Sequence, residues 1–262
     1  MATDIVNLQC GVSLPSMSIN VEANHCVILA HGLGATDPKR KDYTDKWIQM
    51  ALRQLQSNRD VGIVAYTARG HGQSHGWETT AESDIQQFTW RNLATDMMGV
   101  ADHYAKDTFI ACGNSMGAAS ALYAALYYPN RVDAVIMIRP PTAWETRRAR
   151  KGCLQGSADN LLSRYPGGVY HFVLMGAAES DLPPIDCDIY GEISCPVLIL
   201  AHEQDPAHPT SVAMALSRAI ANAEIHIAES VGEAHATWGG IIGGFVERVS
   251  MGRRTGRADC QG

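Results

Sequence analysis

Short apolar runs alternate with longer helical runs along most of this chain, and that rhythm limits its possible folds more than any other feature. The apolar runs are typical of strands buried on both faces, and the runs between them repeat apolar residues with a helical period. The strand-like runs are HCVILAHG, VGIVAYTARGHG, TFIACGNS, VDAVIMI, CPVLILA and AEIHIAES. Such an alternation predicts an α/β fold, with a mostly parallel sheet of about eight strands and helices on both faces.

Two segments depart from this rhythm. The chain up to about Glu22 alternates polar and apolar residues, which predicts an antiparallel hairpin at one edge of the sheet. Residues 139–194 are rich in proline, glycine and charge, and an insertion of that size is typical of a functional segment. We therefore expect a core of residues 1–138 and 195–251, a short helical lid over 139–194 and a flexible tail over 252–262.

The charge balance argues against several kinds of partner. A net charge of −6 provides no basic field for nucleic acid or an acidic membrane surface. No signal peptide and no uncharged apolar stretch long enough to span a bilayer are visible, and none of the seven cysteines pairs at zinc-ribbon or CxxC spacing. We expect a cytoplasmic protein, monomeric or homodimeric, that acts on a small molecule.

One glycine-flanked serine is the strongest chemical signal. Gly113-Asn114-Ser115-Met116-Gly117 follows a strand-like run and precedes a helical one, which is the setting of a nucleophile elbow. The glycines allow helix and strands to approach closely, and Ser115 then projects over the carboxyl edge of the sheet. The N–H groups at the start of the helix would face developing negative charge.

A serine hydroxyl needs a base and an orienting acid to become a nucleophile. In a parallel sheet both should follow later strands, and Asp205 and His235 do so. The resulting order Ser, Asp, His is that of hydrolases built on this elbow, so we expect Ser115, Asp205 and His235 to form a catalytic triad.

Other residues compete for these roles. His202 and His208 flank Asp205, and we expect the first to pack at a strand end and the second to begin a helix. Asp186 and Asp188 are alternative acids, but they lie in the expected lid. A metal cluster around Asp205 lacks the H-E-x-x-H spacing of a helical zinc site, so no metal is expected.

An oxyanion hole needs two backbone N–H donors. Met116, directly after the nucleophile, supplies one, and Leu33 in the glycine loop LAHGLGA is the best candidate for the other. The same loop begins a dinucleotide-binding pattern, but Asp37 stands where the third glycine is required. We therefore expect no cofactor.

Together these motifs resemble the α/β-hydrolase superfamily over nearly the whole chain. HGLGA resembles its oxyanion loop, ARGHGQS the turn after the next strand, GNSMG the elbow, DPAHP the acid loop and GEAHATW the histidine loop. Two positions differ from the family pattern: Thr67 replaces a common aspartate, and Trp238 replaces an acidic residue after the histidine. The short lid and the stretch PPTAWETR are similar to the branch of 3-oxoadipate enol-lactonase-like esterases and lactonases.

That resemblance implies a cofactor-free serine hydrolase acting on a small ester or lactone. Arg139 is a candidate for binding a substrate carboxylate, and Trp144 and Trp238 are candidates for lining an acyl pocket. Two alternatives stay open: a carbon–carbon bond hydrolase or perhydrolase with the same triad, and a hydrolase-fold ligand receptor with little turnover.

Overall fold

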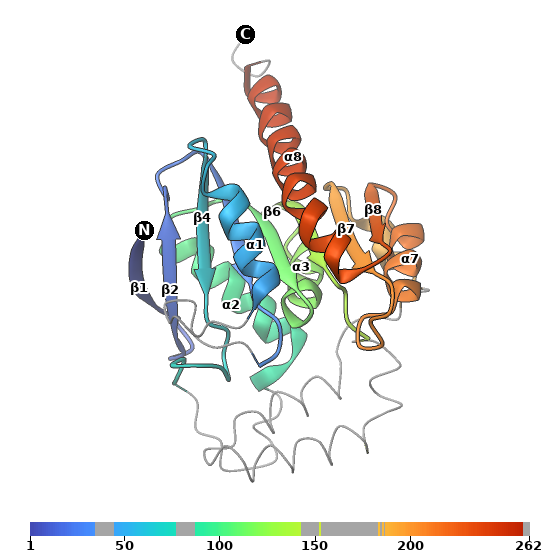
Figure 1. Ribbon diagram of the computed structural model, residues 1–262. Coiled ribbons are helices and arrows are strands. Elements are labelled where there is room, and N and C mark those ends of the chain that lie inside the picture. Colours follow the sequence, from blue (N-terminus) through green and yellow to red (C-terminus); the bar gives the residue numbers. More distant parts are fainter. Residues whose placement is uncertain are drawn as a thin grey trace.

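A computed structural model describes residues 1–34, 45–76, 87–142, 152, 183, 185 and 187–258 of the chain. Within these residues the structure contains one eight-stranded sheet with helices on both sides (Figure 1). The strands are β1 (Ala2–Asn7), β2 (Ser13–Ile19), β3 (His25–Ala30), β4 (Val61–Tyr66), β5 (Phe109–Asn114), β6 (Val132–Ile138), β7 (Val197–His202) and β8 (Ala223–Ala228).

The order of the strands in space is β1-β2-β4-β3-β5-β6-β7-β8. The pairs from β4 to β8 are parallel, whereas β1 pairs antiparallel with β2 and β2 pairs antiparallel with β4. Both the parallel sheet and the antiparallel edge hairpin that the sequence predicts are therefore confirmed.

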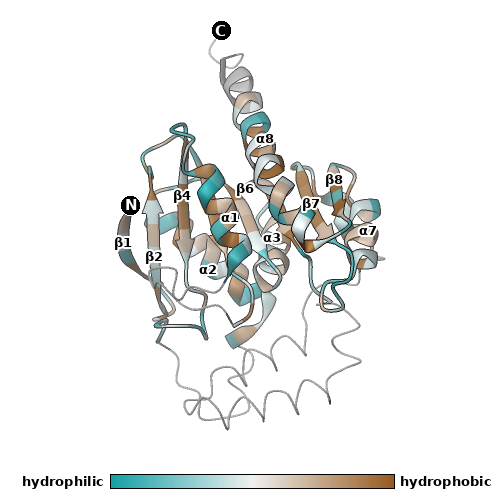
Figure 2. Ribbon diagram, in the orientation of Figure 1, coloured by the Kyte–Doolittle hydropathy of each residue, from teal (hydrophilic) through white to brown (hydrophobic). Residues whose placement is uncertain are grey.

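The helices divide between the two faces of the sheet. α2 (Trp90–His103), α3 (Met116–Tyr127) and α7 (Thr210–Ala219) share one apolar core with the sheet, and α1 (Lys46–Leu55) and α8 (Val231–Ala258) share the other. The strands β4, β5 and β7 are buried along their whole length and mostly apolar, while hydrophilic residues lie mainly on the helices and loops (Figure 2). Strands covered on both faces need no alternation of polar and apolar residues.

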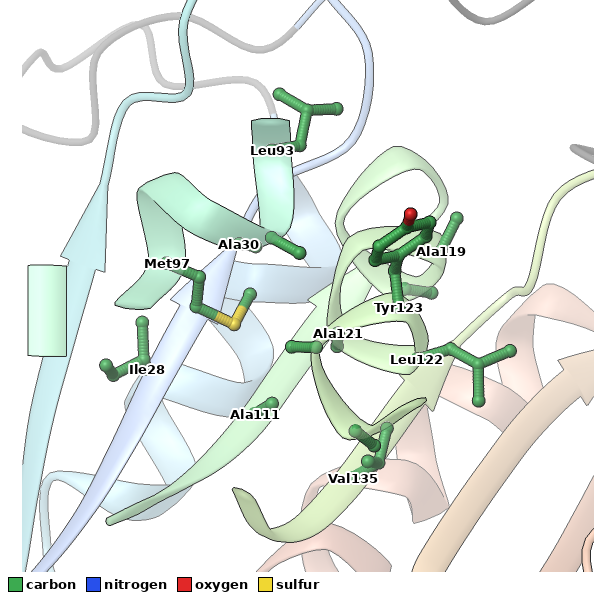
Figure 3. Close-up of a cluster of buried hydrophobic side chains, with 14 of the residues drawn as sticks. Ile28, Ala30, Leu93, Met97, Ala111, Ala119, Ala121, Leu122, Tyr123 and Val135 are labelled. Carbon is green, nitrogen blue, oxygen red and sulfur yellow. The ribbon is translucent and has the colours of Figure 1, made fainter. Parts of the chain in front are cut away.

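Small side chains bring α3 close to the sheet. Figure 3 shows Ala119, Ala121 and Leu122 of the helix in one buried cluster with Ala30 and Ala111 of the neighbouring strands. At the start of the helix even a methyl group is excluded. A Cβ added to Gly117 would lie 2.1 Å from the carbonyl oxygen of Ala30, and one added to Gly113 would lie 2.1 Å from the backbone of Gly117.

Two expectations about chain organisation have different outcomes. Helix α8 continues to Ala258, so most of the segment 252–262 is helical, and the flexibility expected of it stays a prediction. The lid expected over 139–194 lies mostly outside the described residues. None of the helices in the described ranges combines the length and apolar character that crossing a bilayer requires.

Substituting Gly117 by alanine should destabilise the protein by at least about 3 kcal/mol, because the new methyl group overlaps backbone that cannot move aside. Gly240→Ala is the matched control: this glycine is exposed in α8 with open space around its Cα. The control should gain up to about 1 kcal/mol from helix propensity. Urea unfolding measures both, and a Gly117→Ala protein as stable as the control would contradict this packing.

Candidate active site

Ser115 lies at the sharp turn between β5 and α3, with backbone angles φ 51° and ψ −110°. A non-glycine residue in this region stores strain of about 1–3 kcal/mol. Two features hold Ser115 in this conformation. Its N–H donates to the carbonyl of Ile138 at 2.9 Å, and Gly113 and Gly117 permit the close approach of α3. The sequence motif thus forms the strained elbow that it predicts.

A turn directly after β7 provides a histidine partner for this serine and a carboxylate partner for that histidine. Nε2 of His208 lies 2.8 Å from Oγ of Ser115, and Nδ1 of His208 lies 2.8 Å from Oδ2 of Asp205. The turn itself is held by the His208 N–H donating to the Asp205 carbonyl at 3.1 Å and by the Ala207 N–H donating to Oδ1 of Asp205 at 3.2 Å. Serine, histidine and carboxylate therefore form a continuous hydrogen-bonded chain.

The direction of this chain follows from its carboxylate end. An ionised carboxylate only accepts hydrogen bonds, so Nδ1 of His208 must be the donor to Asp205. In the neutral ring Nε2 then has a lone pair, and Oγ–H of Ser115 donates to it. This is the tautomer that a general base for the serine requires.

The structure does not bring His235 to Ser115, and this corrects the expected triad. His235 lies in the second turn of α8 and is exposed, and its ring stacks on Trp47 with 4.4 Å between centroids and 1° between planes. In the described part of the chain no hydrogen bond joins it to Ser115 or Asp205. Of the two histidines set aside as structural, His208 takes the position expected for His235.

Two capping hydrogen bonds at the start of α8 explain where His235 lies. Oγ of Ser230 accepts from the Glu233 N–H at 3.2 Å, and the Glu233 carboxylate accepts from the Glu229 N–H at 2.8 Å. This pattern begins α8 at Val231, only two residues after β8, and leaves no loop that could reach back to the elbow. The letters SVGE carry this signal in the sequence.

Asp205 is the expected acid, and the structure places it beside His208. Its burial alone would raise its pKa, but His208, Arg139 and His202 outweigh that effect, and the pKa lies below its ordinary value. The competing acids lie elsewhere: Asp188 is exposed in the short 3-10 helix Asp188–Glu192, and Asp186 lies outside the described residues.

Arg139 follows β6 directly, as expected, and lines the same cavity as Ser115. Its guanidinium donates to Oδ1 of Asn114 at 3.2 Å and to Oδ2 of Asp205 at 3.3 Å, and it lies 5.0 Å from the Trp47 ring centroid. Burial lowers the pKa of Arg139, while Asp205 and Asp45 act to raise it. These contacts favour a role in positioning Asp205 over the expected role as a free receptor for a substrate carboxylate.

Asn114 and Asp45 complete this network, and sequence reasoning assigned neither a role. Nδ2 of Asn114 donates to Oδ2 of Asp45 at 3.0 Å, and the same oxygen accepts the Gly32 N–H at 2.7 Å. Asp45 also caps α1 through two backbone N–H groups. The elbow residue before the nucleophile thus ties α1, the glycine loop and Arg139 together.

In the glycine loop after β3, one backbone donor has no acceptor among the residues that the structure describes. The Gly32 N–H donates to Asp45, and the Gly34 N–H donates to Nε2 of His71 at 3.2 Å. Burial, aided by His31, lowers the pKa of His71 to about 3, which keeps that nitrogen an acceptor. Within the described ranges the N–H groups of Leu33 and Met116, the two expected oxyanion donors, have no acceptor.

A cavity of about 420 Å³ contains these groups. Its lining includes the loop Gly32–Gly34, Ser115, Arg139 and His208, together with Asp45, Lys46 and Trp47. A larger cavity of about 520 Å³ lies at the other ends of the strands, where β6, β7 and β8 begin, beside the later turns of α8. The larger one contains no part of the serine–histidine chain, so the smaller one is the candidate active site.

The two tryptophans expected to line an acyl pocket have other outcomes. Trp238 is buried with 1% of its surface exposed and packs against Trp47 and His202, at 4.8 Å and 6.0 Å between ring centroids. It is a core residue on the inner face of α8, which corrects the expectation. Trp144 lies outside the described residues. Among the residues that are described, no group of three or more histidine, cysteine or acidic side chains is arranged to hold a metal ion.

Comparisons with known proteins agree with this architecture. Residues 26–152 match the family described as alpha/beta hydrolase fold. The enol-lactonase from Burkholderia xenovorans LB400 superposes with a TM-score of 0.67 at 16% identity, over 94% of this chain and 99% of its own. A thermophilic esterase from Thermogutta terrifontis gives 0.68 at 18% identity, over 95% of this chain and 100% of its own. The chain has the α/β-hydrolase fold.

The chain is also similar in sequence to an enol-lactonase. 3-Oxoadipate enol-lactonase 2 of Acinetobacter baylyi is 25% identical over 197 residues, which is 64% of this chain and 70% of that protein. The named relative and both structural neighbours are hydrolases. The resemblance found in the motifs is therefore confirmed for the α/β-hydrolase fold, and the chain is similar in sequence to an enol-lactonase.

The strain at Ser115 predicts a difference between two variants that both lack the hydroxyl. Ser115→Gly should be more stable than Ser115→Ala by about 1 kcal/mol, because glycine adopts a positive φ freely and this relief exceeds its entropic cost. Urea unfolding of the two proteins measures the difference. An alanine variant at least as stable as the glycine variant would mean that the elbow is not strained.

The lowered pKa of Asp205 predicts a pH-dependent contribution to stability. The ionised group stabilises the fold fully above its ordinary pKa of about 4, and this stabilisation is lost as the pH falls through the lower folded value. The unfolding free energies of the wild type and Asp205→Asn should therefore differ more at pH 5 than at pH 3. An equal or larger difference at pH 3 would contradict the assignment.

Proposed function

We propose that this protein is a serine hydrolase that cleaves a small carboxylic ester or lactone through an acyl-enzyme. Ser115 is the nucleophile, His208 the general base and Asp205 the acid that orients the base. One observation carries the proposal: the hydrogen-bonded chain from Oγ of Ser115 through both nitrogens of His208 to Oδ2 of Asp205.

Each step of the proposed reaction uses one of these groups. His208 takes the Ser115 proton as Oγ attacks the substrate carbonyl, and Asp205 stabilises the imidazolium that forms. The carbonyl oxygen becomes negatively charged between the Leu33 and Met116 N–H groups, which replace water as donors. His208 then returns its proton to the leaving alcohol, or to the ring oxygen of a lactone. Water releases the acyl group by the same route.

Relatives support the class of substrate. An enol-lactonase is similar in sequence, and an enol-lactonase and an esterase share the fold. A cavity of about 420 Å³ is at the lower end of the usual range for small-molecule sites, which favours a compact substrate. The proposed reaction requires no cofactor, and we propose that it takes place in the cytoplasm.

A fluorophosphonate probe tests both the chemistry and the choice of histidine. Labelling of the wild type should be lost in Ser115→Ala and reduced by at least about 1000-fold in His208→Ala, because the serine loses its base. His235→Ala is the matched control, since this exposed histidine has no contact with the serine, and its labelling rate should stay within about threefold of the wild type.

Intact protein mass and the rate of labelling provide the measurement. Equal labelling of Ser115→Ala and wild type would refute the serine hydrolase. Loss of labelling in His235→Ala with retention in His208→Ala would restore His235 as the base and refute the triad proposed here.

A further inference from the structure

One buried carboxylate lies between the glycine loop and the nucleophile elbow. Asp45 directly precedes α1, and only 6% of it is exposed. Its Oδ1 accepts the N–H groups of Trp47 and Ile48, both at 3.1 Å. Its Oδ2 accepts the Gly32 N–H at 2.7 Å and a hydrogen bond from Nδ2 of Asn114 at 3.0 Å. One oxygen therefore holds the helix, and the other holds the loop and the elbow.

Capping of α1 needs only the first of these oxygens. A serine or threonine hydroxyl also caps a helix, and it does so without bringing a charged group into a buried place. The second oxygen of Asp45 contributes no hydrogen bond to the helix, since both of its donors come from elsewhere in the chain. A carboxylate at this position therefore provides contacts with the loop and the elbow that a hydroxyl would not.

The glycine loop is held on both sides of the expected oxyanion donor. The Gly32 N–H donates to Asp45, and the Gly34 N–H donates to Nε2 of His71 at 3.2 Å. Between them the Leu33 N–H has no acceptor among the described residues, and Leu33 lines the cavity of the candidate active site. Because peptide groups are planar, fixing the groups on either side limits the directions in which the Leu33 N–H can point.

The contact with Asp45 also lies directly against the nucleophile. A Cβ added to Gly32 would lie 2.9 Å from Nδ2 of Asn114 and 3.4 Å from Oδ2 of Asp45. It would also lie 3.4 Å from Cβ of Ser115. Because Asn114 immediately precedes Ser115 in the elbow, the hydrogen bonds of Asp45 link the loop to the nucleophile by a short path.

The negative charge of Asp45 does not itself favour an oxyanion. A carboxylate repels a nearby developing negative charge, so its benefit must come from the direction that it gives to the N–H donors. Two cationic side chains line the same cavity and offset the carboxylate: Lys46 and Arg139. Arg139 also donates to Oδ1 of Asn114 at 3.2 Å, on the other side of the amide that Asp45 binds.

We propose that Asp45 is a positioning residue for the oxyanion hole. It holds the Gly32 peptide against the elbow, so that the Leu33 N–H stays directed at the carbonyl oxygen of the ester or lactone that Ser115 attacks. Preorganised donors of this kind stabilise the transition state more than the bound substrate. The catalytic role rests on the hydrolase function proposed above, whereas the hold on the Gly32 N–H does not.

Two substitutions at position 45 separate positioning from capping. Asp45→Ser has one oxygen, which caps α1 and leaves the Gly32 N–H without an acceptor, and Asp45→Ala removes both contacts. With p-nitrophenyl acetate as the substrate, kcat should fall by about 10- to 100-fold in both variants, while KM stays within about threefold of the wild type. The serine variant should still unfold at a higher urea concentration than the alanine variant, because its helix keeps a cap.

Thr89→Ala is the matched control for the loss of a cap. The Thr89 hydroxyl caps α2 by accepting the Asn92 N–H at 3.3 Å, and in the described part of the chain Thr89 does not line the cavity. This variant should be less stable than the wild type, with kcat within about twofold of it. If capping were the whole role of Asp45, kcat would return to the wild-type value in Asp45→Ser, and that result would overturn the proposal.

Amide hydrogen exchange tests the hold on the loop without any substrate. In Asp45→Ser the Gly32 N–H should exchange at least about 10-fold faster than in the wild type, whereas Thr89→Ala should leave its rate unchanged. An unchanged Gly32 rate in Asp45→Ser overturns the proposal, whatever the kinetics. Faster exchange with an unchanged kcat overturns the role in catalysis.

The proposed hydrolase can fail separately. A wild type that neither turns over p-nitrophenyl acetate nor reacts with a fluorophosphonate refutes the hydrolase function. The exchange rate of the Gly32 N–H in Asp45→Ser then still decides whether Asp45 holds the loop: faster exchange supports that hold, and an unchanged rate refutes it.

Discussion

The contact between the first turn of α3 and the backbone of β3 is the constraint on which the site depends. Gly117 lies so close to the carbonyl of Ala30 that no side chain fits between them. This approach forces Ser115 into a strained turn and directs it over the edge of the sheet where the parallel strands end. The residues that follow these strands, among them Leu33, Arg139 and His208, line the same cavity as the Ser115 hydroxyl.

The carboxylate of Asp205 organises the charge around that oxygen. Three positively charged or protonatable groups, Arg139, His202 and His208, lie within 3.4 Å of its Oδ2. The proposed base comes from the same turn as the acid, three residues later, so one short loop fixes their relative geometry. Arg139 links this turn to the elbow through Asn114. A displacement of the turn would therefore also shift the elbow, and the reverse holds too.

Much of this structure follows from the sequence because its signals are local. Apolar runs and helical periodicity predict the strands and helices, and G-x-S-x-G with its flanking glycines predicts the elbow at Ser115. The choice of base is not local. A histidine after β8 fits the family pattern, but the capping residues Ser230 and Glu233 begin a helix that takes His235 away. Which of Asp205's neighbouring histidines faces the serine depends on how the turn after β7 closes, and spacing alone does not decide that.

A crystal structure of the fluorophosphonate adduct would test the account most directly. The proposed triad and oxyanion hole predict a covalent bond from phosphorus to Oγ of Ser115. They also place the phosphoryl oxygen within hydrogen-bond distance of the Leu33 and Met116 N–H groups. The ring of His208 should remain between the adduct and Asp205. An adduct on another residue, or on Ser115 with His235 in place of His208, would contradict it.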